Sequence, residues 1–193
     1  MESSWNAALS GLWDSLRAAL GLKPAQVTAA SRQGGGPARI LLMRHAEKTG
    51  DPDDMYLSEA GVRRTERLAT YIPETFGRPD FIFAASKSKH SFRSIETMKP
   101  LAAALGLKVH HHVEDNDFAD LVTMIFSDAQ YQGATIVICW HHQKLPEIAQ
   151  LLGAKPGLCP DPWPLDLFNL ILKFDYDAAS NALPNVTRIE EPF

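Results

Sequence analysis

Short apolar runs alternate with longer amphipathic segments from residue 38 to the end of the chain. The runs predict strands over residues 39–43, 81–85, 107–113, 135–140 and 168–174. Apolar residues at helical spacing predict helices over residues 58–72, 92–105, 118–129 and 146–152. Three of the strands are almost continuously apolar, which is typical of strands buried on both faces. The alternation predicts a three-layer α/β/α sandwich with a mostly parallel central sheet, and a ligand site beyond the carboxyl ends of its strands.

The first 37 residues have a different pattern. Apolar residues at helical spacing predict an amphipathic helix over residues 4–21, and a linker rich in Gly, Ala, Ser, Gln and Pro follows over residues 23–37. We therefore divide the chain into an N-terminal helix with linker, residues 1–37, and a catalytic domain, residues 38–193. The helix is expected to dock on the domain or on a second subunit, which would make a homodimer. A membrane-surface helix is the less favoured alternative, because the polar face lacks an excess of lysine and arginine.

Composition narrows the classes of partner. The chain has 193 residues, 45% of them hydrophobic, and a formal net charge of -4, so it can bury a core but offers no broad cationic surface for nucleic acid. Two cysteines provide no disulfide framework, which favours a reducing cytoplasm. The sequence shows neither a secretion signal nor an apolar run long enough to span a membrane. Any anion must therefore be bound by a local cluster of side chains.

Such a cluster is expected where three predicted strands end. Arg44 and His45 follow the first strand, Arg93 lies beyond the second, and His141 and His142 follow the fourth. Each arginine has a planar set of donors that matches phosphate oxygens. A histidine attacks phosphorus only when it is neutral, and nearby positive charges lower its pKa. The pattern predicts a phosphate site in which His45 is the nucleophile.

Four motifs extend this interpretation. Arg44-His45 closes the first strand, residues 57–61 read Leu-Ser-Glu-Ala-Gly, residues 91–97 read Ser-Phe-Arg-Ser-Ile-Glu-Thr, and residues 139–142 read Cys-Trp-His-His. In order and spacing they resemble the motifs of the histidine phosphatase superfamily, the group that includes cofactor-dependent phosphoglycerate mutases. The resemblance covers roughly residues 38–153 and implies a phosphoglycerate mutase-like fold.

The resemblance also implies an activity. It is that of a phosphatase that hydrolyses phosphomonoesters through a phosphohistidine intermediate on His45, with Arg44, Arg93 and a second histidine on the phosphate. The expected substrate is a phosphorylated small molecule or a phosphoprotein. We expect no cofactor and no resident metal ion.

The second histidine has two candidates. His141 aligns with phosphatases whose strand ends in Gly-His-Ser-Asn-Thr-Ile-Pro, whereas His142 aligns with a Trp-x-His-x-x-[Ile/Leu]-Pro pattern. His142 is preferred as a phosphate-binding and catalytic residue, because Trp140, Leu145 and Pro146 match the second pattern at every marked position. Alternation along a strand lets only one of the two neighbouring histidines point into the site.

The general acid is open at this stage. Glu47 follows the nucleophile closely, while Glu114, Asp115 and Asp117 follow the third predicted strand. Asp117 and Glu114 are ranked first as catalytic acids, because a lid or acid-bearing loop could lie there.

Two other classes of function remain as alternatives. A degenerate phosphatase fold could bind phosphorylated ligands without turnover. A metal-dependent hydrolase could use His110, His111 and His112 together with His90 or His141. Two arguments disfavour the metal site. His111 points away from its two neighbours on a strand, and Arg44 and Arg93, at the carboxyl ends of the strands, would repel a cation.

Overall fold

The computed structural model describes residues 35–193 except 52, 178, 179 and 181. The elements in this part of the chain are β1 (Arg39–Arg44), α2 (Glu59–Phe76), β2 (Phe81–Ala84), α3 (Arg93–Leu105), β3 (Val109–His110), α4 (Phe118–Ser127), the 3₁₀ turn η2 (Ala129–Tyr131), β4 (Thr135–Trp140), α5 (Leu145–Leu151), β5 (Leu170–Asp175) and β6 (Asn185–Glu190). The helix predicted over residues 4–21, and the homodimer expected from it, lie outside the described residues.

The six strands form one mixed sheet in the order β3-β2-β4-β1-β5-β6. The pairs β1–β4, β2–β4 and β2–β3 are parallel, whereas β5 runs antiparallel to β1 and β6 antiparallel to β5. The central pair is in a register that sets Arg44 opposite Trp140. His45 and His141 therefore leave the sheet side by side.

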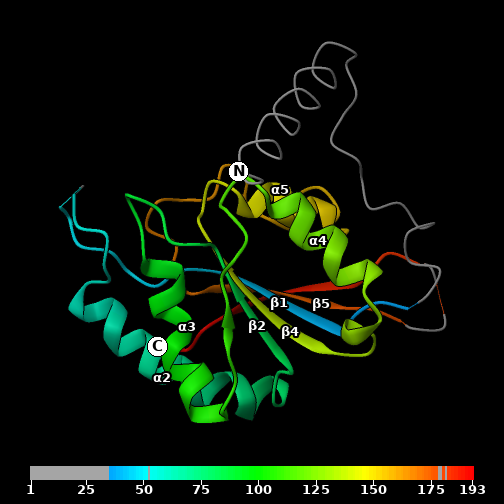
Figure 1. Ribbon diagram of the computed structural model, residues 1–193. Coiled ribbons are helices and arrows are strands. Elements are labelled where there is room, and N and C mark those ends of the chain that lie inside the picture. The colour runs from blue at the N-terminus through cyan, green and yellow to red at the C-terminus, as the bar shows by residue number, and fades with distance from the viewer. Residues whose placement is uncertain (1–34, 52, 178–179, 181) are drawn as a thin grey trace, which may run out of the picture.

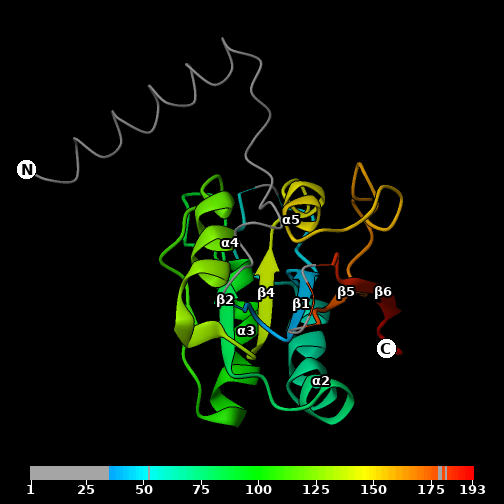
Figure 2. The same cartoon turned by 90° about the vertical axis from the view of Figure 1, so that its right-hand side faces the viewer.

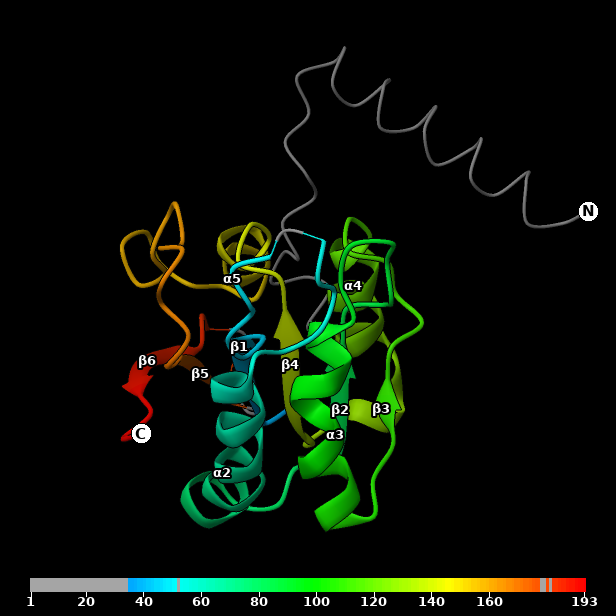
Figure 3. The ribbon, with the colours of Figure 1, turned by 90° about the vertical axis from the view of Figure 1, so that its left-hand side faces the viewer.

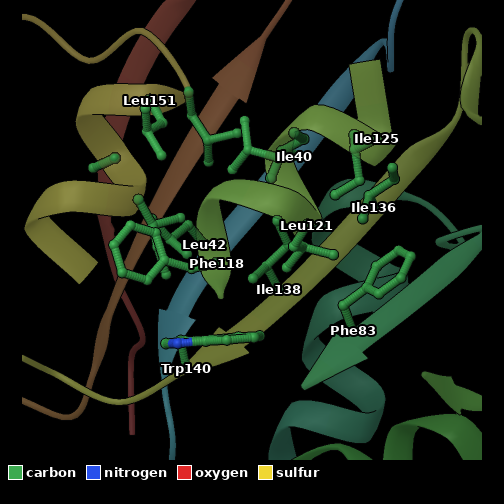
Figure 4. Close-up of a cluster of buried hydrophobic side chains, with 14 of the residues drawn as sticks. Ile40, Leu42, Phe83, Phe118, Leu121, Ile125, Ile136, Ile138, Trp140 and Leu151 are labelled. Carbon is green, nitrogen blue, oxygen red and sulfur yellow. The ribbon is translucent and has the colours of Figure 1, made fainter. Parts of the chain in front are cut away.

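Helices cover both faces of the sheet, as Figures 1, 2 and 3 show from three directions. Ile40 and Leu42 of β1 pack with α4 and α5, and Leu41 and Met43 pack with α2 and α3. Successive side chains of a strand point to opposite faces, so a strand with helices on both sides is apolar at every position. Figure 4 shows the first cluster, in which the indole of Trp140 lies among side chains of β1, β4 and α4.

Two edge strands differ from the prediction. The strand expected over residues 107–113 is only two residues long, because β3 pairs with β2 alone and the chain turns away at His111. Strand β6 was not predicted, since most of its residues are exposed and polar and carry no apolar signal. The strand expected over residues 168–174 begins two residues later, at Leu170.

Among the described residues, no helix is long and apolar enough to cross a bilayer.

The Leu-Ser-Glu-Ala-Gly motif anchors the start of α2 to the loop that follows β1. The Ser58 hydroxyl accepts the Gly61 N–H at 3.1 Å, and the Ser58 N–H donates to the Glu47 carbonyl at 2.9 Å. A Cβ on Gly61 would lie 2.3 Å from the same Glu47 oxygen. Only glycine therefore lets α2 approach the backbone two residues beyond His45.

Arg64 of α2 joins the same loop to the end of β6. Its guanidinium donates to both carboxylate oxygens of Glu47 at 2.7–2.9 Å, to Glu191 at 2.5 Å and to the Phe193 carbonyl at 3.1 Å. The Glu191 side chain is fully buried, and burial raises its pKa to about 7 despite the attraction of Arg64. The Arg64 guanidinium thus pairs with the carboxylates of both Glu47 and Glu191.

We expect Gly61→Ala to lower the free energy of unfolding by about 1–3 kcal/mol, because the added methyl group would meet the Glu47 carbonyl rather than a flexible side chain. Urea unfolding followed by circular dichroism measures this. The matched control is Gly50→Ala, since a Cβ there meets nothing within 4 Å. Equal stabilities for the two variants would contradict the close approach.

Glu191 should make stability depend on pH. Because its pKa in the folded state is raised, its stabilising contribution is complete below pH ~4.5 and is lost as the pH rises through about 7. Glu191→Gln lacks that loss, so its free energy of unfolding relative to wild type should rise between pH 5 and pH 8 by up to about 3 kcal/mol. Urea unfolding at the two pH values measures it, with Glu190→Gln on the exposed side of β6 as control. A Glu191→Gln difference that does not change with pH would refute the prediction.

Candidate active site

His45 lies at the carboxyl end of β1 with 2% of its surface exposed. Its Nδ1 is 2.7 Å from the carbonyl oxygen of Ala46, which can only accept, so Nδ1 carries the proton and Nε2 keeps its lone pair. The backbone on either side is fixed as well, because the His45 N–H donates to the Trp140 carbonyl at 3.1 Å and the Ala46 N–H donates to Thr97 Oγ1 at 2.9 Å. The imidazole is held in one tautomer and one orientation.

The surroundings keep this imidazole neutral. Burial is the main cause that lowers the pKa of His45 well below its usual value, and the charges of Arg44, His141 and Arg93 lower it further. The hydrogen bond to Ala46 acts in the opposite direction without reversing the result. At neutral pH, His45 therefore presents an unprotonated Nε2.

Arg44 is almost completely buried beside it. Its Nη1 donates to the carbonyls of Pro164, Leu165 and Leu167 at 2.8–3.3 Å, and its Cζ lies 3.9 Å from the ring centroid of Phe168. Burial, followed by the charge of Arg93, lowers the pKa of Arg44 to about 10, so it remains a cation at neutral pH. Its Nε is buried and has no hydrogen-bond partner within the described ranges.

Arg93 begins α3 and faces the same region. Its guanidinium donates to the carbonyls of Asp54 at 2.7 Å and His90 at 3.3 Å, while its Nε is a second buried donor without a partner in the part of the chain described here. Thr97, one turn later, donates to the Arg93 carbonyl at 2.8 Å and accepts from Ala46. The first turn of α3 thus holds Arg93 in place and also fixes the backbone that follows His45.

His141 is the histidine that contacts His45. The two ring centroids are 5.6 Å apart in an edge-to-face arrangement. The Nδ1 of His141 is 2.6 Å from Oδ1 of Asp115, and its Nε2 is 3.0 Å from Oγ of Ser91. Sequence reasoning assigned no role to Ser91 and ranked Asp115 behind Asp117 and Glu114, because both contacts join segments that are distant along the chain.

His142 lies in a different position. It lines an open pocket of about 420 Å³ together with residues 161–165, and burial with the charges of Arg44 and His141 lowers its pKa to about 4. The charge of Arg44 influences its ring, but the histidine ring in described contact with that of His45 belongs to His141. The structure therefore brings the ring of His141, and not that of the expected His142, into described contact with His45.

The candidate acids are distributed differently from the expectation. Glu47 is engaged by Arg64, which lowers its pKa. Glu114 is exposed, and Asp117 is exposed at the start of α4, where its backbone carbonyl accepts the Asp120 N–H at 2.9 Å. Asp115, which was ranked behind both, is the carboxylate that reaches a histidine of the site.

Of the histidine run 110–112, only His110 belongs to β3, where its ring packs against Phe83. The ring centroid of His110 lies 5.2 Å from that of Phe83 and 6.4 Å from that of His112. His111 and His112 are exposed. Among the residues with described positions, no group of three or more His, Cys, Asp or Glu side chains could hold a metal ion.

Comparison with known proteins identifies the fold. No family model and no curated protein sequence matches the chain. The protein histidine phosphatase SixA complexed with tungstate matches 79% of this chain and 96% of its own, with 16% identity and a TM-score of 0.55. A putative phosphohistidine phosphatase SixA from Agrobacterium tumefaciens matches 80% and 99%, with 18% identity and a TM-score of 0.54.

A third similar structure belongs to a protein with a different named activity. The mycobacterial glucosyl-3-phosphoglycerate phosphatase with inorganic phosphate covers 79% of this chain and 95% of its own, with 13% identity and a TM-score of 0.52. At these identities the matches establish the arrangement of the elements and leave the chemistry to be argued from the site. The similar structures confirm the kind of fold that the motifs implied, and the described part of the chain has the fold of these phosphatases.

Proposed function

We propose that this chain is a phosphatase that hydrolyses phosphomonoesters through a phosphohistidine on His45. The observation that carries the proposal is the state of the His45 ring: Nδ1 is tied to the Ala46 carbonyl, and the buried imidazole is kept neutral beside two arginines. A neutral imidazole whose Nε2 lone pair points in a fixed direction can attack phosphorus.

We also interpret the architecture as a three-layer α/β/α sandwich with a mostly parallel sheet. The helices on both faces and the parallel pairs of β1, β2, β3 and β4 support this interpretation.

Arg44 and Arg93 fit the role of phosphate-binding residues. Each is held by backbone carbonyls, and each has a buried Nε that lacks a partner among the described residues. A bound phosphoryl group would supply oxygen acceptors and negative charge where the protein offers two fixed cations. Their positions near His45 would also spread the charge that develops during transfer.

The reaction has two steps. In the first, the Nε2 lone pair of His45 forms a bond to phosphorus while the bond from phosphorus to the ester oxygen breaks, and that oxygen takes a proton. In the second, a water oxygen bonds to phosphorus, the phosphorus–nitrogen bond breaks, and the water gives up a proton. His45 returns to its neutral form with its proton still on Nδ1. No resident metal or cofactor takes part.

His141 is proposed as the second histidine of the site, in place of His142. The support is its ring contact with His45 and its two hydrogen bonds to side chains of other segments. The substrate class remains a phosphorylated small molecule or a phosphoprotein. The similar structures include proteins named for each kind of substrate, a protein histidine phosphatase and a glucosyl-3-phosphoglycerate phosphatase.

His45→Ala is expected to abolish acid-labile phosphate incorporation and to lower the hydrolysis of 4-nitrophenyl phosphate by at least about 10³-fold, because the covalent route is lost. Quenched-flow labelling and steady-state absorbance measure the two quantities. His112→Ala, which removes an exposed histidine beyond the end of β3, should change neither.

The same assays separate the alternative functions. Wild-type protein that binds vanadate yet shows neither labelling nor turnover would be a binding module. Turnover that survives His45→Ala but disappears with a chelator would belong to a metal-dependent hydrolase. Either result would refute the phosphohistidine route.

A further inference from the structure

Three residues from separate loops form a continuous hydrogen-bonded chain beside His45. Asp115 precedes α4, His141 follows β4, and Ser91 precedes α3; the carboxylate lies 2.6 Å from Nδ1 and the hydroxyl 3.0 Å from Nε2 of the imidazole. An ionised carboxylate only accepts hydrogen bonds, so Nδ1 carries the proton of the neutral ring. Nε2 then accepts from the hydroxyl when the ring is neutral and donates to the hydroxyl oxygen when the ring is protonated. This is the arrangement of a histidine prepared to exchange a proton at Nε2.

Both steps of the proposed reaction move a proton near phosphorus. A carboxylic acid is the simple candidate, but Glu47 accepts three hydrogen bonds from Arg64, and Glu114 and Asp117 are exposed. His141 is the titratable side chain whose ring contacts that of the nucleophile, at 5.6 Å between centroids. The geometry thus offers a histidine where the sequence suggested a carboxylate.

We infer that His141 transfers the proton in both steps, and that Asp115 and Ser91 position it; this inference rests on the phosphatase function proposed above. In the first step, protonated His141 gives the Nε2 proton to the ester oxygen as that oxygen leaves phosphorus. In the second, the neutral ring takes a proton from water as the water oxygen bonds to phosphorus and His45 departs. The second step restores protonated His141, so the cycle closes with one water consumed and one alcohol and one inorganic phosphate released.

Asp115 is fixed from the protein core. Its backbone carbonyl accepts the indole N–H of Trp140 at 3.1 Å, and Trp140 is completely buried in the cluster between β4 and α4. Trp140 also directly precedes His141, so one buried residue sets the distance between the carboxylate and the imidazole. The carboxylate keeps the proton on Nδ1 and pairs with the imidazolium when His141 is protonated.

Ser91 holds the other nitrogen. It is 5% exposed, its Oγ accepts the Arg93 N–H at 3.4 Å, and its carbonyl accepts the Ser88 N–H at 3.0 Å. The turn that presents Arg93 to the phosphate therefore also directs Nε2 of His141. An imidazole nitrogen serves one partner at a time, so Nε2 leaves the hydroxyl for the substrate or water oxygen when it acts.

The test compares two leaving groups on Asp115→Asn. Phenolate is a poor leaving group that needs protonation, whereas 2,4-dinitrophenolate leaves without it. We expect kcat for phenyl phosphate to fall by about 10²–10³-fold. The burst of 2,4-dinitrophenolate, which reports phosphorylation of His45, should stay within a few-fold of wild type. Because water then lacks a base, the phosphoenzyme should accumulate after that burst.

Two further variants sharpen the result. His141→Gln should show the same selective loss, which keeps the test decisive if Asp115→Asn fails to fold. Ser91→Ala should show a smaller loss of the same kind, about tenfold, because it removes one anchor of the ring and leaves the proton carrier. Asp120→Asn, which neutralises an exposed carboxylate in the first turn of α4, is the matched control and should leave both rates unchanged.

The outcomes distinguish the two levels of the proposal. An equal loss for both leaving groups in Asp115→Asn and His141→Gln would mean that His141 only binds phosphate or supports the fold, and would overturn the inference while the phosphatase function stands. Wild-type protein that forms no phosphoenzyme with 2,4-dinitrophenyl phosphate would instead overturn the proposed function itself.

Discussion

The parallel pairing of β1 with β4 is the constraint on which the candidate site depends. Arg44 is opposite Trp140 in this pair, so the chain leaves both strands at the same level and His45 meets His141. The two strands occupy the centre of the sheet and are buried on both faces, which makes their register costly to change. A slip by one residue would turn every side chain of β1 to the opposite face and separate the two rings.

The burial of Arg44 and His45 determines the chemistry of the site where β1 and β4 end. Arg44 is removed from water by the carbonyls of Pro164, Leu165 and Leu167 and by the ring of Phe168, all from a segment that follows α5. Desolvation and the neighbouring guanidinium lower the pKa of Arg44, and burial lowers the pKa of His45 well below its usual value. The outcome is a neutral nucleophile among fixed cations, an arrangement that favours a dianionic phosphoryl group over a cation.

The motifs act as structural braces as well as sources of functional groups. Gly61 lets the first turn of α2 touch the Glu47 carbonyl, and Thr97 holds the Ala46 N–H. Glu47 is in turn taken by Arg64, which keeps a carboxylate close in sequence to His45 away from the role of acid. The sequence ranked Asp117 and Glu114 first among the acids, whereas the described contact between a carboxylate and a histidine beside His45 is that of Asp115 with His141.

The sequence by itself determined the alternation of elements, the buried central strands and the strand ends that hold Arg44, His45 and Arg93, because hydrophobic periodicity and residue chemistry are local properties of the chain. It missed the edge strand β6 and made the edge strand β3 too long, since each of them pairs with a neighbour on one side only and carries little apolar pattern. It also could not choose between His141 and His142 or assign Asp115 and Ser91. Those roles depend on which loops meet around one imidazole, and only the tertiary structure decides that, because the partners are separated by 26 and 50 residues along the chain.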